Sequence, residues 1–328
     1  MRVAIIGAGF CGLATAWHLS QISDFDITLF DAKGIGNGAS GVAAGLLHPY
    51  PGAHAKEALM STQGIDATLN LIAVAEKTLG VPLITSKGLL RLALTPQQHA
   101  DFSLCAEKHR DVHWRSINET QASTPSIIAY PGIFIDSAFV VDCKNYLQGL
   151  WKACEKEGIR YQEALITTLS ELKEFDQIVV AGGAQSTSIE ELSTLPLTPV
   201  KGQILEFNWP EHLSPLSFPV NSHTYLLMHP NAKTCLVGAT YERQFSTPLP
   251  MKDVAIRELM PKVKSFFPHL EESNIINCST GIRASTPDHK PLLSKISSKT
   301  WILSGMGSKG LLYHALYGKE LARRLTLV

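Results

Sequence analysis

The first 31 residues alternate between apolar runs and a glycine-rich segment. Residues 2–6 form a short β-branched run, which is typical of a buried parallel strand. Glycines follow at positions 7, 9 and 12, and residues 13–19 are compatible with a helix. A second apolar run over residues 26–30 predicts another strand. The order of strand, glycine turn, helix and strand indicates the first unit of a doubly wound nucleotide-binding domain.

Further along the chain the same pattern recurs. Residues 144–158 have helical character, and residues 178–181 form another apolar strand that runs into Gly182 and Gly183. Residues 301–304 predict a last strand, followed by a glycine bend and a helix that begins near Gly310. This pattern predicts an α/β fold.

The spacing of the three glycines in the first turn has a physical reason. Gly7 permits the tight turn, Gly9 lets a pyrophosphate approach the backbone, and Gly12 lets the helix pack closely on the strand. Asp31 stands where an acidic side chain would accept hydrogen bonds from ribose hydroxyls. This context favours a dinucleotide site over a simple tight turn, and the acid argues against NADP. The choice between FAD and NAD stays open at this motif.

Composition and charge limit the possible partners. The chain has 328 residues, of which 45% are hydrophobic and 18% charged, so two packed domains are expected. Its 29 basic and 29 acidic residues leave no net charge to attract nucleic acid or an anionic membrane. Six scattered cysteines predict reduced thiols and no metal site. We expect no signal peptide, no membrane span and a cytoplasmic location.

A long loop of small residues over positions 34–49 follows the second predicted strand. Here the sequence resembles the D-amino-acid oxidase superfamily of flavoproteins, especially the branch of glycine oxidase, sarcosine oxidase and the oxidase module of the bifunctional tRNA wobble-uridine enzyme. In that family the loop runs beneath FAD. The matching residues are Ala39, Ser40, Ala43, Ala44, Gly45 and Leu46. A flexible surface linker is the alternative, which the interleaved apolar residues of the loop disfavour.

The C-terminal region carries the second part of the resemblance. Residues 281–292 are similar to the family's Gly-x-Arg-x-x-Thr-x-Asp-x-x-Pro segment. The helix starting near Gly310 is expected to direct its N-terminus at the flavin, with Lys309 either adding charge there or simply lying in a surface turn. The sequence departs from the family at Ser294, where glycine is usual, and at Ser308, near which glycine oxidase has a second arginine. The resemblance therefore does not identify the substrate.

The resemblance implies FAD as the cofactor and a set of residues that contact it. The implied cofactor-binding residues are Gly7, Gly9, Phe10, Cys11, Gly12, Asp31, Ala39, Ser40, Ala43, Ala44, Gly45, Leu46, Gly182, Gly183, Gly307, Ser308, Lys309, Gly310 and Leu311. Arg283 matches an arginine that pairs with a substrate carboxylate, although a structural ion pair is an alternative. Tyr225 matches a tyrosine near the substrate in that family. His48 lies where the chain leaves the flavin loop and is a candidate to face the flavin ring. Each of these two is also compatible with a structural role.

The expected architecture is a FAD-binding Rossmann-like domain from residues 1–80, 135–195 and 275–328, and a substrate domain from residues 81–134 and 196–274. The resemblance further implies that residues 225–228 and 236–242 are paired strands and that a second, mainly antiparallel sheet is present. The expected function is FAD-dependent oxidation of a small amine or amino acid, giving an imine that hydrolyses, with oxygen or a quinone as electron acceptor. One alternative is removal of a carboxymethyl group from a modified tRNA wobble uridine, which the balanced charge disfavours. Others are an NAD-dependent dehydrogenase and a flavin-binding protein without catalysis.

Overall fold

A six-stranded sheet holds the two ends of the chain. The computed structural model describes residues 1–327, so residue 328 of the last expected segment lies outside the described residues. The strand order is β14 (Leu292–Lys295), β15 (Thr300–Ser304), β8 (Gln177–Val180), β1 (Arg2–Ile6), β2 (Asp26–Asp31) and β7 (Arg160–Glu163). All neighbours are parallel except β14 and β15. This is the strand order of a doubly wound nucleotide-binding sheet.

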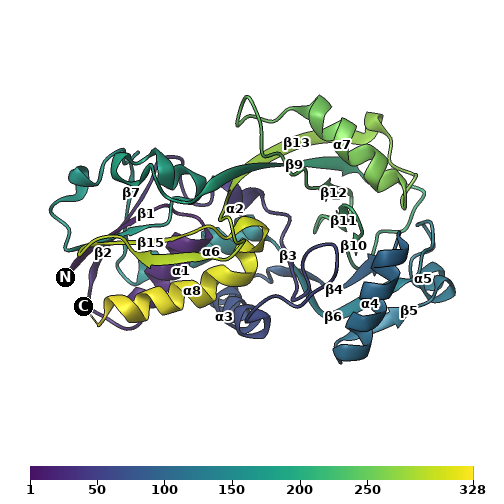
Figure 1. The fold of residues 1–328 in the computed structure, drawn as a ribbon, viewed down its shortest axis with the longest axis horizontal. Coiled ribbons are helices and arrows are strands. Elements are labelled where there is room, and N and C mark those ends of the chain that lie inside the picture. Colours follow the sequence, from purple (N-terminus) through teal and green to yellow (C-terminus); the bar gives the residue numbers. More distant parts are fainter. Residues whose placement is uncertain (328) are drawn as a thin grey trace.

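Helices cover one face of this sheet, as Figure 1 shows. They are α1 (Phe10–Ser20), α3 (Ser61–Leu79), α6 (Cys143–Lys156) and α8 (Gly310–Leu325). Val3 and Ile5 of β1 point into the core beneath them, whereas Ala4 and Ile6 point into a smaller core on the other face. That second core includes residues of the 3-10 helices Leu169–Leu172 and Glu190–Leu192, and a further 3-10 helix spans Gly183–Ser188. A strand buried on both faces explains the continuous apolar run of residues 3–6.

The second sheet is larger and mostly antiparallel. Its order is β13 (Ile275–Ser285), β9 (Thr198–Asn208), β12 (Thr234–Gly238), β11 (Tyr225–Met228), β10 (Val220–Asn221), β4 (Ile84–Leu92), β6 (Gly132–Val141) and β3 (Leu46–Leu47), and β5 (Val112–Arg115) also pairs with β6. Helix α7 (Lys252–Lys264) packs on one face of this sheet. The remaining helices are α2 (Ala39–Val42), α4 (Pro96–Lys108), α5 (Ile117–Ser123) and the 3-10 turns Glu272–Asn274 and Gly307–Lys309.

Two long strands link the parts of the molecule. β9 and β13 pair antiparallel from Thr198 and Ser285 at one end to Phe207 and Ile275 at the other. In Figure 1 they extend from beside the six-stranded sheet to the region beneath α7. The expected boundary at residue 275 falls at the start of β13, which lies in the second sheet. The division into domains stays a prediction.

The predicted elements are present in the structure. The expected helix over residues 144–158 is α6, and the paired strands are β11 and β12, which ends at Gly238 rather than 242. The α/β fold with a second, mainly antiparallel sheet is confirmed. Among the helices described within residues 1–327, none has both the length and the apolarity to cross a membrane.

Candidate active site

The first glycine turn lies between β1 and α1. Gly7 has φ +108°, and a Cβ atom there would lie 2.5 Å from the Ala181 carbonyl oxygen. A Cβ atom on Gly12 would lie 1.8 Å from the Gly7 carbonyl oxygen. Both positions therefore require glycine, because backbone atoms cannot move aside without breaking the turn. Gly9 differs, since its Cβ atom would meet only the Ser40 hydroxyl, at 2.8 Å.

Asp31 binds the same turn from the end of β2. Its Oδ2 accepts a hydrogen bond from the Ala8 backbone amide at 2.8 Å, and its Oδ1 accepts one from the Lys33 amide at 2.8 Å. The carboxylate is thus held beside the start of α1 before any ligand binds. An acidic side chain fixed there suits a ribose diol, whose hydroxyls donate hydrogen bonds to carboxylate oxygens.

Ser40 joins the loop of residues 34–49 to the first helix. Its hydroxyl accepts a hydrogen bond from the Phe10 backbone amide, at 3.1 Å. The Gly36 amide also donates to the Ala8 carbonyl at 3.0 Å. Because the first amides of a helix lack intrahelical partners, Ser40 satisfies one of them at the place where a phosphate would bind.

Two further glycine segments converge on this turn. The Ala181 amide donates to the Ile6 carbonyl at 2.7 Å, so Gly182 lies directly against Gly7. Gly310, the first residue of α8, faces the Phe10 ring, because a Cβ atom added to it would lie 3.5 Å from that ring. The N-terminal ends of α1 and α8 are therefore neighbours. Together they favour negative charge between them.

The small-residue loop continues from Ser40 to the second sheet. Ala39 lies against Gly281 of β13, where a Cβ atom would be 3.0 Å from the Ala39 Cα. Gly45 has φ +84°, and its carbonyl accepts a hydrogen bond from the Val141 backbone amide at 2.9 Å. The loop is therefore packed between both sheets, and the surface-linker alternative is wrong.

The residues present fit FAD. A backbone cradle without side chains at Gly7 and Gly9, a preset carboxylate at Asp31 and two adjacent helix N-termini supply what a dinucleotide pyrophosphate and ribose require. Ser186 also has a buried hydroxyl without a hydrogen-bond partner within residues 1–327, 3.5 Å from the position of a Cβ atom on Gly182.

Some implied cofactor residues could contact FAD through their backbone only. Cys11 packs against the helical core, and burial raises the pKa of its thiol to about 12. Leu311 is buried in the same core. Lys309 donates from Nζ to the His289 carbonyl at 2.8 Å and lies over the Tyr313 ring, so its ammonium group is already engaged. Its charge is near α8 but is not free to move with a ligand.

Arg283 stands on the face of β13 that also carries Gly281, since residues two apart share one face of a strand. Its guanidinium lies over Gly202 of β9, where a Cβ atom would be 1.8 Å from Nη2. Nη2 donates to the Thr240 carbonyl at 2.9 Å. Burial lowers the pKa of Arg283, and the neighbours that oppose this shift are Tyr225 and Tyr241. The structural ion pair considered for Arg283 is absent within residues 1–327, where the guanidinium makes the one hydrogen bond to Thr240.

Tyr225 lies beside this cation. Its hydroxyl oxygen would be 2.6 Å from a Cβ atom on Gly238, its partner on β12. Burial raises the pKa of this hydroxyl, and the charge of Arg283 opposes the increase. Tyr225 is thus protonated at neutral pH and able to donate a hydrogen bond next to the guanidinium.

A row of paired residues extends across the sheet from Tyr225. Tyr225 pairs with Asn221 of β10, and Asn221 pairs with Arg91 of β4. Paired residues present their side chains on the same face of a sheet. Asn221 is half-buried and its carboxamide has no hydrogen-bond partner within the described chain. It is therefore a polar group of the site that the sequence did not reveal.

Arg91 ends this row, and its charge acts on His48, which follows β3. Burial, with the charge of Arg91, lowers the pKa of His48 to about 3, and its Nδ1 is buried without a partner among the described residues. Arg91 donates to the carbonyls of Tyr50 and Gly52 at 2.6 and 2.5 Å. His48 is thus a neutral imidazole at neutral pH, near the charge of Arg91.

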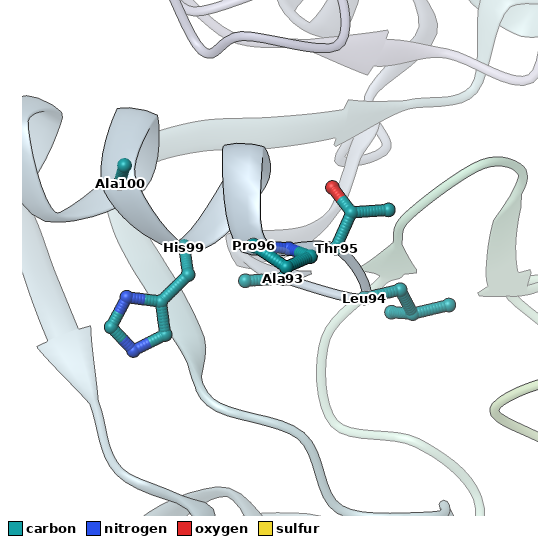
Figure 2. Close-up of a pocket in the computed structure, with 6 residues that line it drawn as sticks. All are labelled: Ala93, Leu94, Thr95, Pro96, His99 and Ala100. Atoms are coloured by element: carbon teal, nitrogen blue, oxygen red, sulfur yellow. The ribbon is translucent and has the colours of Figure 1, made fainter.

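The hollow drawn in Figure 2 is a different place. Figure 1 shows its helix, α4, at the opposite end of the molecule from α1 and the glycine turn. Its lining residues carry no formal charge apart from a histidine ring and are Ala93, Leu94, Thr95, Pro96, His99 and Ala100. It shares no residue with the site described above.

Comparison with known proteins agrees with this geometry. Residues 2–324 match the family described as FAD dependent oxidoreductase. A curated relative, the tRNA 5-methylaminomethyl-2-thiouridine biosynthesis bifunctional protein MnmC of Maricaulis maris, is 26% identical over 98% of this chain and 52% of its own length. The chain thus spans about half the length of that relative.

Solved structures share the fold at lower identity. Glycine oxidase from Geobacillus kaustophilus superposes with a TM-score of 0.85 at 21% identity, over 98% of this chain and 95% of that one. Iminodiacetate oxidase from Chelativorans sp. BNC1 gives 0.83 at 20% identity, over 99% and 95%. With the match across nearly its whole length, the chain belongs to the family of FAD-dependent oxidoreductases and is a flavoenzyme.

Proposed function

We propose that this flavoenzyme oxidises a small amine that carries a carboxylate, such as an amino acid or an N-substituted glycine. The observation that supports this proposal is the half-buried guanidinium of Arg283, which pairs with no protein carboxylate within residues 1–327 and lies on the same strand face as Gly281, next to the cofactor loop. Within residues 1–327 this half-buried guanidinium hydrogen-bonds to the Thr240 carbonyl and has no counter-charge, so a carboxylate ligand would stabilise it.

When bound, FAD would supply the redox chemistry of the proposed reaction, as the acceptor of a hydride from the substrate carbon that bears the nitrogen. The resulting imine is hydrolysed by water to a carbonyl compound and an amine, and oxygen or a quinone takes up the electrons. The protein has to bind, orient and exclude water, which requires no nucleophilic triad.

Three side chains of the candidate site suit the binding and orientation of such a substrate. Arg283 would grip both oxygens of the carboxylate with its planar guanidinium. Tyr225 would donate its hydroxyl to the same carboxylate, because the hydroxyl is protonated and lies beside Arg283. Neutral His48 would line the pocket without adding positive charge near the amine. A substrate held at one end in this way presents its amine-bearing carbon in a fixed orientation.

Removal of a carboxymethyl group from a modified tRNA uridine is the second candidate. It is favoured by the curated relatives, whose name places them in tRNA 5-methylaminomethyl-2-thiouridine biosynthesis. An amine that bears a carboxymethyl group presents the same carboxylate, one carbon from nitrogen, as glycine does. The balanced net charge argues against a large polyanionic partner.

Anaerobic bleaching of the flavin separates the two candidates. The holoenzyme is mixed without oxygen with glycine, sarcosine, proline and D-amino acids, and separately with tRNA carrying the carboxymethylamino uridine. We expect a small amino acid to bleach the absorbance near 450 nm within seconds at millimolar concentration, an order of magnitude typical of KM values. Bleaching by the tRNA alone would replace the proposal with the second candidate. No bleaching by any of these compounds would contradict both.

A further inference from the structure

Arg283 has a long side chain, and its position depends on few contacts. Its hydrogen bond from Nη2 to the Thr240 carbonyl, at 2.9 Å, is the one that fixes the guanidinium to a neighbouring segment. The ring of Tyr241 lies 5.8 Å from the guanidinium carbon and adds a weaker contact. Because a free arginine side chain has many rotamers, the place of the Thr240 carbonyl largely decides where the charge lies.

Thr240 is itself held on every polar atom. Its backbone amide donates to the Gln203 carbonyl at 3.1 Å, and its hydroxyl accepts from the Gln203 amide at 2.9 Å. The same hydroxyl donates to Oε1 of Glu242 at 2.6 Å. The residue is fully buried, so water does not replace these bonds. The residue whose carbonyl binds Arg283 is therefore held in place by Gln203 and Glu242.

Glu242 completes the hydrogen-bond network of Thr240 and Gln203. Its Oε1 also accepts from Nε2 of Gln203 at 2.9 Å, and its backbone exchanges two 2.9 Å hydrogen bonds with Lys201. Gln203 is adjacent in sequence to Gly202, so its side chain points away from the face on which Arg283 lies. The carboxylate thus reaches the active site only through Thr240. No direct pair joins Glu242 to Arg283 within residues 1–327.

We propose that Glu242 is a positioning residue for Arg283 and acts through Thr240, a role that rests on the proposed function of Arg283 in carboxylate binding. Glu242 works as a hydrogen-bond acceptor and not as a counter-charge, since its Oε1 accepts from Thr240 and Gln203 and forms no ion pair with Arg283 within residues 1–327. An amide oxygen in place of Oε1 accepts the same two hydrogen bonds. Charge removal alone therefore has little effect, whereas loss of the acceptor displaces the guanidinium.

The test uses the FAD-loaded enzyme and two small probes of equal shape, acetate and acetamide. Binding is followed by the change in the flavin absorption spectrum. Glu242→Leu is expected to raise the Kd for acetate about tenfold, in line with couplings between residues of one hydrogen-bond network. The Kd for acetamide and the affinity for FAD should change less than twofold by the same measure. Glu242→Gln restores the acetate Kd to within about threefold of the wild type.

The same substitutions in an Arg283→Ala background show whether Glu242 affects acetate binding through Arg283. If Glu242 acts through Arg283, Glu242→Leu adds no further loss of acetate affinity there. A loss of the same size in both backgrounds, or an equal loss for acetate and acetamide, would show a general structural role and overturn the proposal. If Arg283→Ala leaves acetate binding unchanged, the carboxylate role of Arg283 fails, which is a separate outcome and refutes the proposed function as well.

Thr240 supplies a second pair of variants in case Glu242→Leu does not fold. Thr240→Ser keeps the hydroxyl that bridges Gln203 and Glu242, and Thr240→Val removes it at almost constant shape. We expect weakened acetate binding for valine and recovery for serine, with KM for a carboxylate substrate rising more than kcat falls. Equal acetate affinity of the two variants contradicts the proposal.

Discussion

The hydroxyl of Ser40 accepts a hydrogen bond from the backbone amide of Phe10 at 3.1 Å. Ser40 belongs to the short helix α2, and Phe10 is the first residue of α1, 30 positions earlier. The contact joins the small-residue loop to the phosphate-binding turn, so the two halves of the expected cofactor site are positioned by each other. A substitution in either the loop or the turn should therefore change the affinity for a ligand that contacts both.

Gly9→Ala tests this junction. A Cβ atom there would lie 2.8 Å from the Ser40 hydroxyl and touch no backbone. We expect FAD binding to weaken about tenfold, while the apoprotein loses no more than about 1 kcal/mol of unfolding free energy. Fluorescence titration with FAD and urea unfolding measure the two quantities.

Gly12→Ala is the matched control for that variant. Its Cβ atom would lie 1.8 Å from the Gly7 carbonyl, so the strand and helix must separate. It should destabilise the apoprotein by several kcal/mol, at the upper end of single substitutions. Equal unfolding free energies for the two variants would contradict this distinction.

Asp31→Ala removes a carboxylate that accepts from the amides of Ala8 and Lys33 and that would bind the ribose. We expect the Kd for FAD to rise by about 10- to 100-fold, as for loss of charge-assisted hydrogen bonds. Asp31→Asn keeps one acceptor oxygen and should lie between the two. Equilibrium dialysis with FAD gives the three values, and identical Kd values would remove Asp31 from the cofactor site.

Arg283→Ala should leave FAD bound and raise the substrate concentration needed for half-maximal rate by roughly 30- to 1,000-fold, the loss of a two-oxygen charge pair. Arg283→Lys should recover part of this loss, because lysine keeps the charge but not the planar fork. Steady-state kinetics with the substrate found by flavin bleaching provide the measurement. Unchanged kinetics in the alanine variant would contradict the assigned role.

His314 gives the protein a predictable dependence on acid. It is fully buried on α8, its Nε2 accepts from the Tyr146 hydroxyl at 2.7 Å, and burial lowers its pKa to about 4. Between about pH 4 and pH 6.5 this histidine is protonated in the unfolded chain, where its pKa is near 6.5, and is neutral in the folded protein. This contribution to stability is therefore complete above pH 6.5 and lost as pH falls toward 4.

In His314→Gln no proton is taken up at this position on unfolding. The decrease of the unfolding free energy with falling pH should therefore be smaller than in the wild type, by up to about 1.4 kcal/mol per pH unit around pH 5. Tyr146→Phe is the control, since it removes the hydroxyl donor and lowers stability by about 1 kcal/mol while keeping the imidazole. Urea unfolding at several pH values checks both. A wild-type slope in His314→Gln would be inconsistent with a buried neutral imidazole.

The sequence was sufficient to predict the glycine turns and the sheet that presents them. Gly7 and Gly12 are needed by local backbone geometry, and a buried parallel strand is recognisable from its own residues. These features depend on neighbours along the chain. The same holds for α8, whose start near Gly310 follows from the bend before it.

Features of the second sheet were harder to predict, because they depend on which strands pair. Asn221 lies in a strand of only two residues and enters the site through its register with Tyr225 and Arg91. Gly202 and Gly238 leave room for Arg283 and Tyr225 from other strands, and glycine inside a strand is the one local signal of such close approach. The link between Thr240 and Glu242 has no local signal.

Gly281 and Arg283 are two residues apart on the same strand, one against the Ala39 segment and the other over Gly202. A pleated strand advances about 6.6 Å over two residues and stretches very little. The interval between the Cα atoms of Gly281 and Arg283 is thus a property of the backbone itself, whereas the guanidinium lies where the Thr240 carbonyl holds it. A relative that accepts a longer acid would have to offer the guanidinium a different acceptor or recruit a new cation elsewhere, because the strand itself does not lengthen.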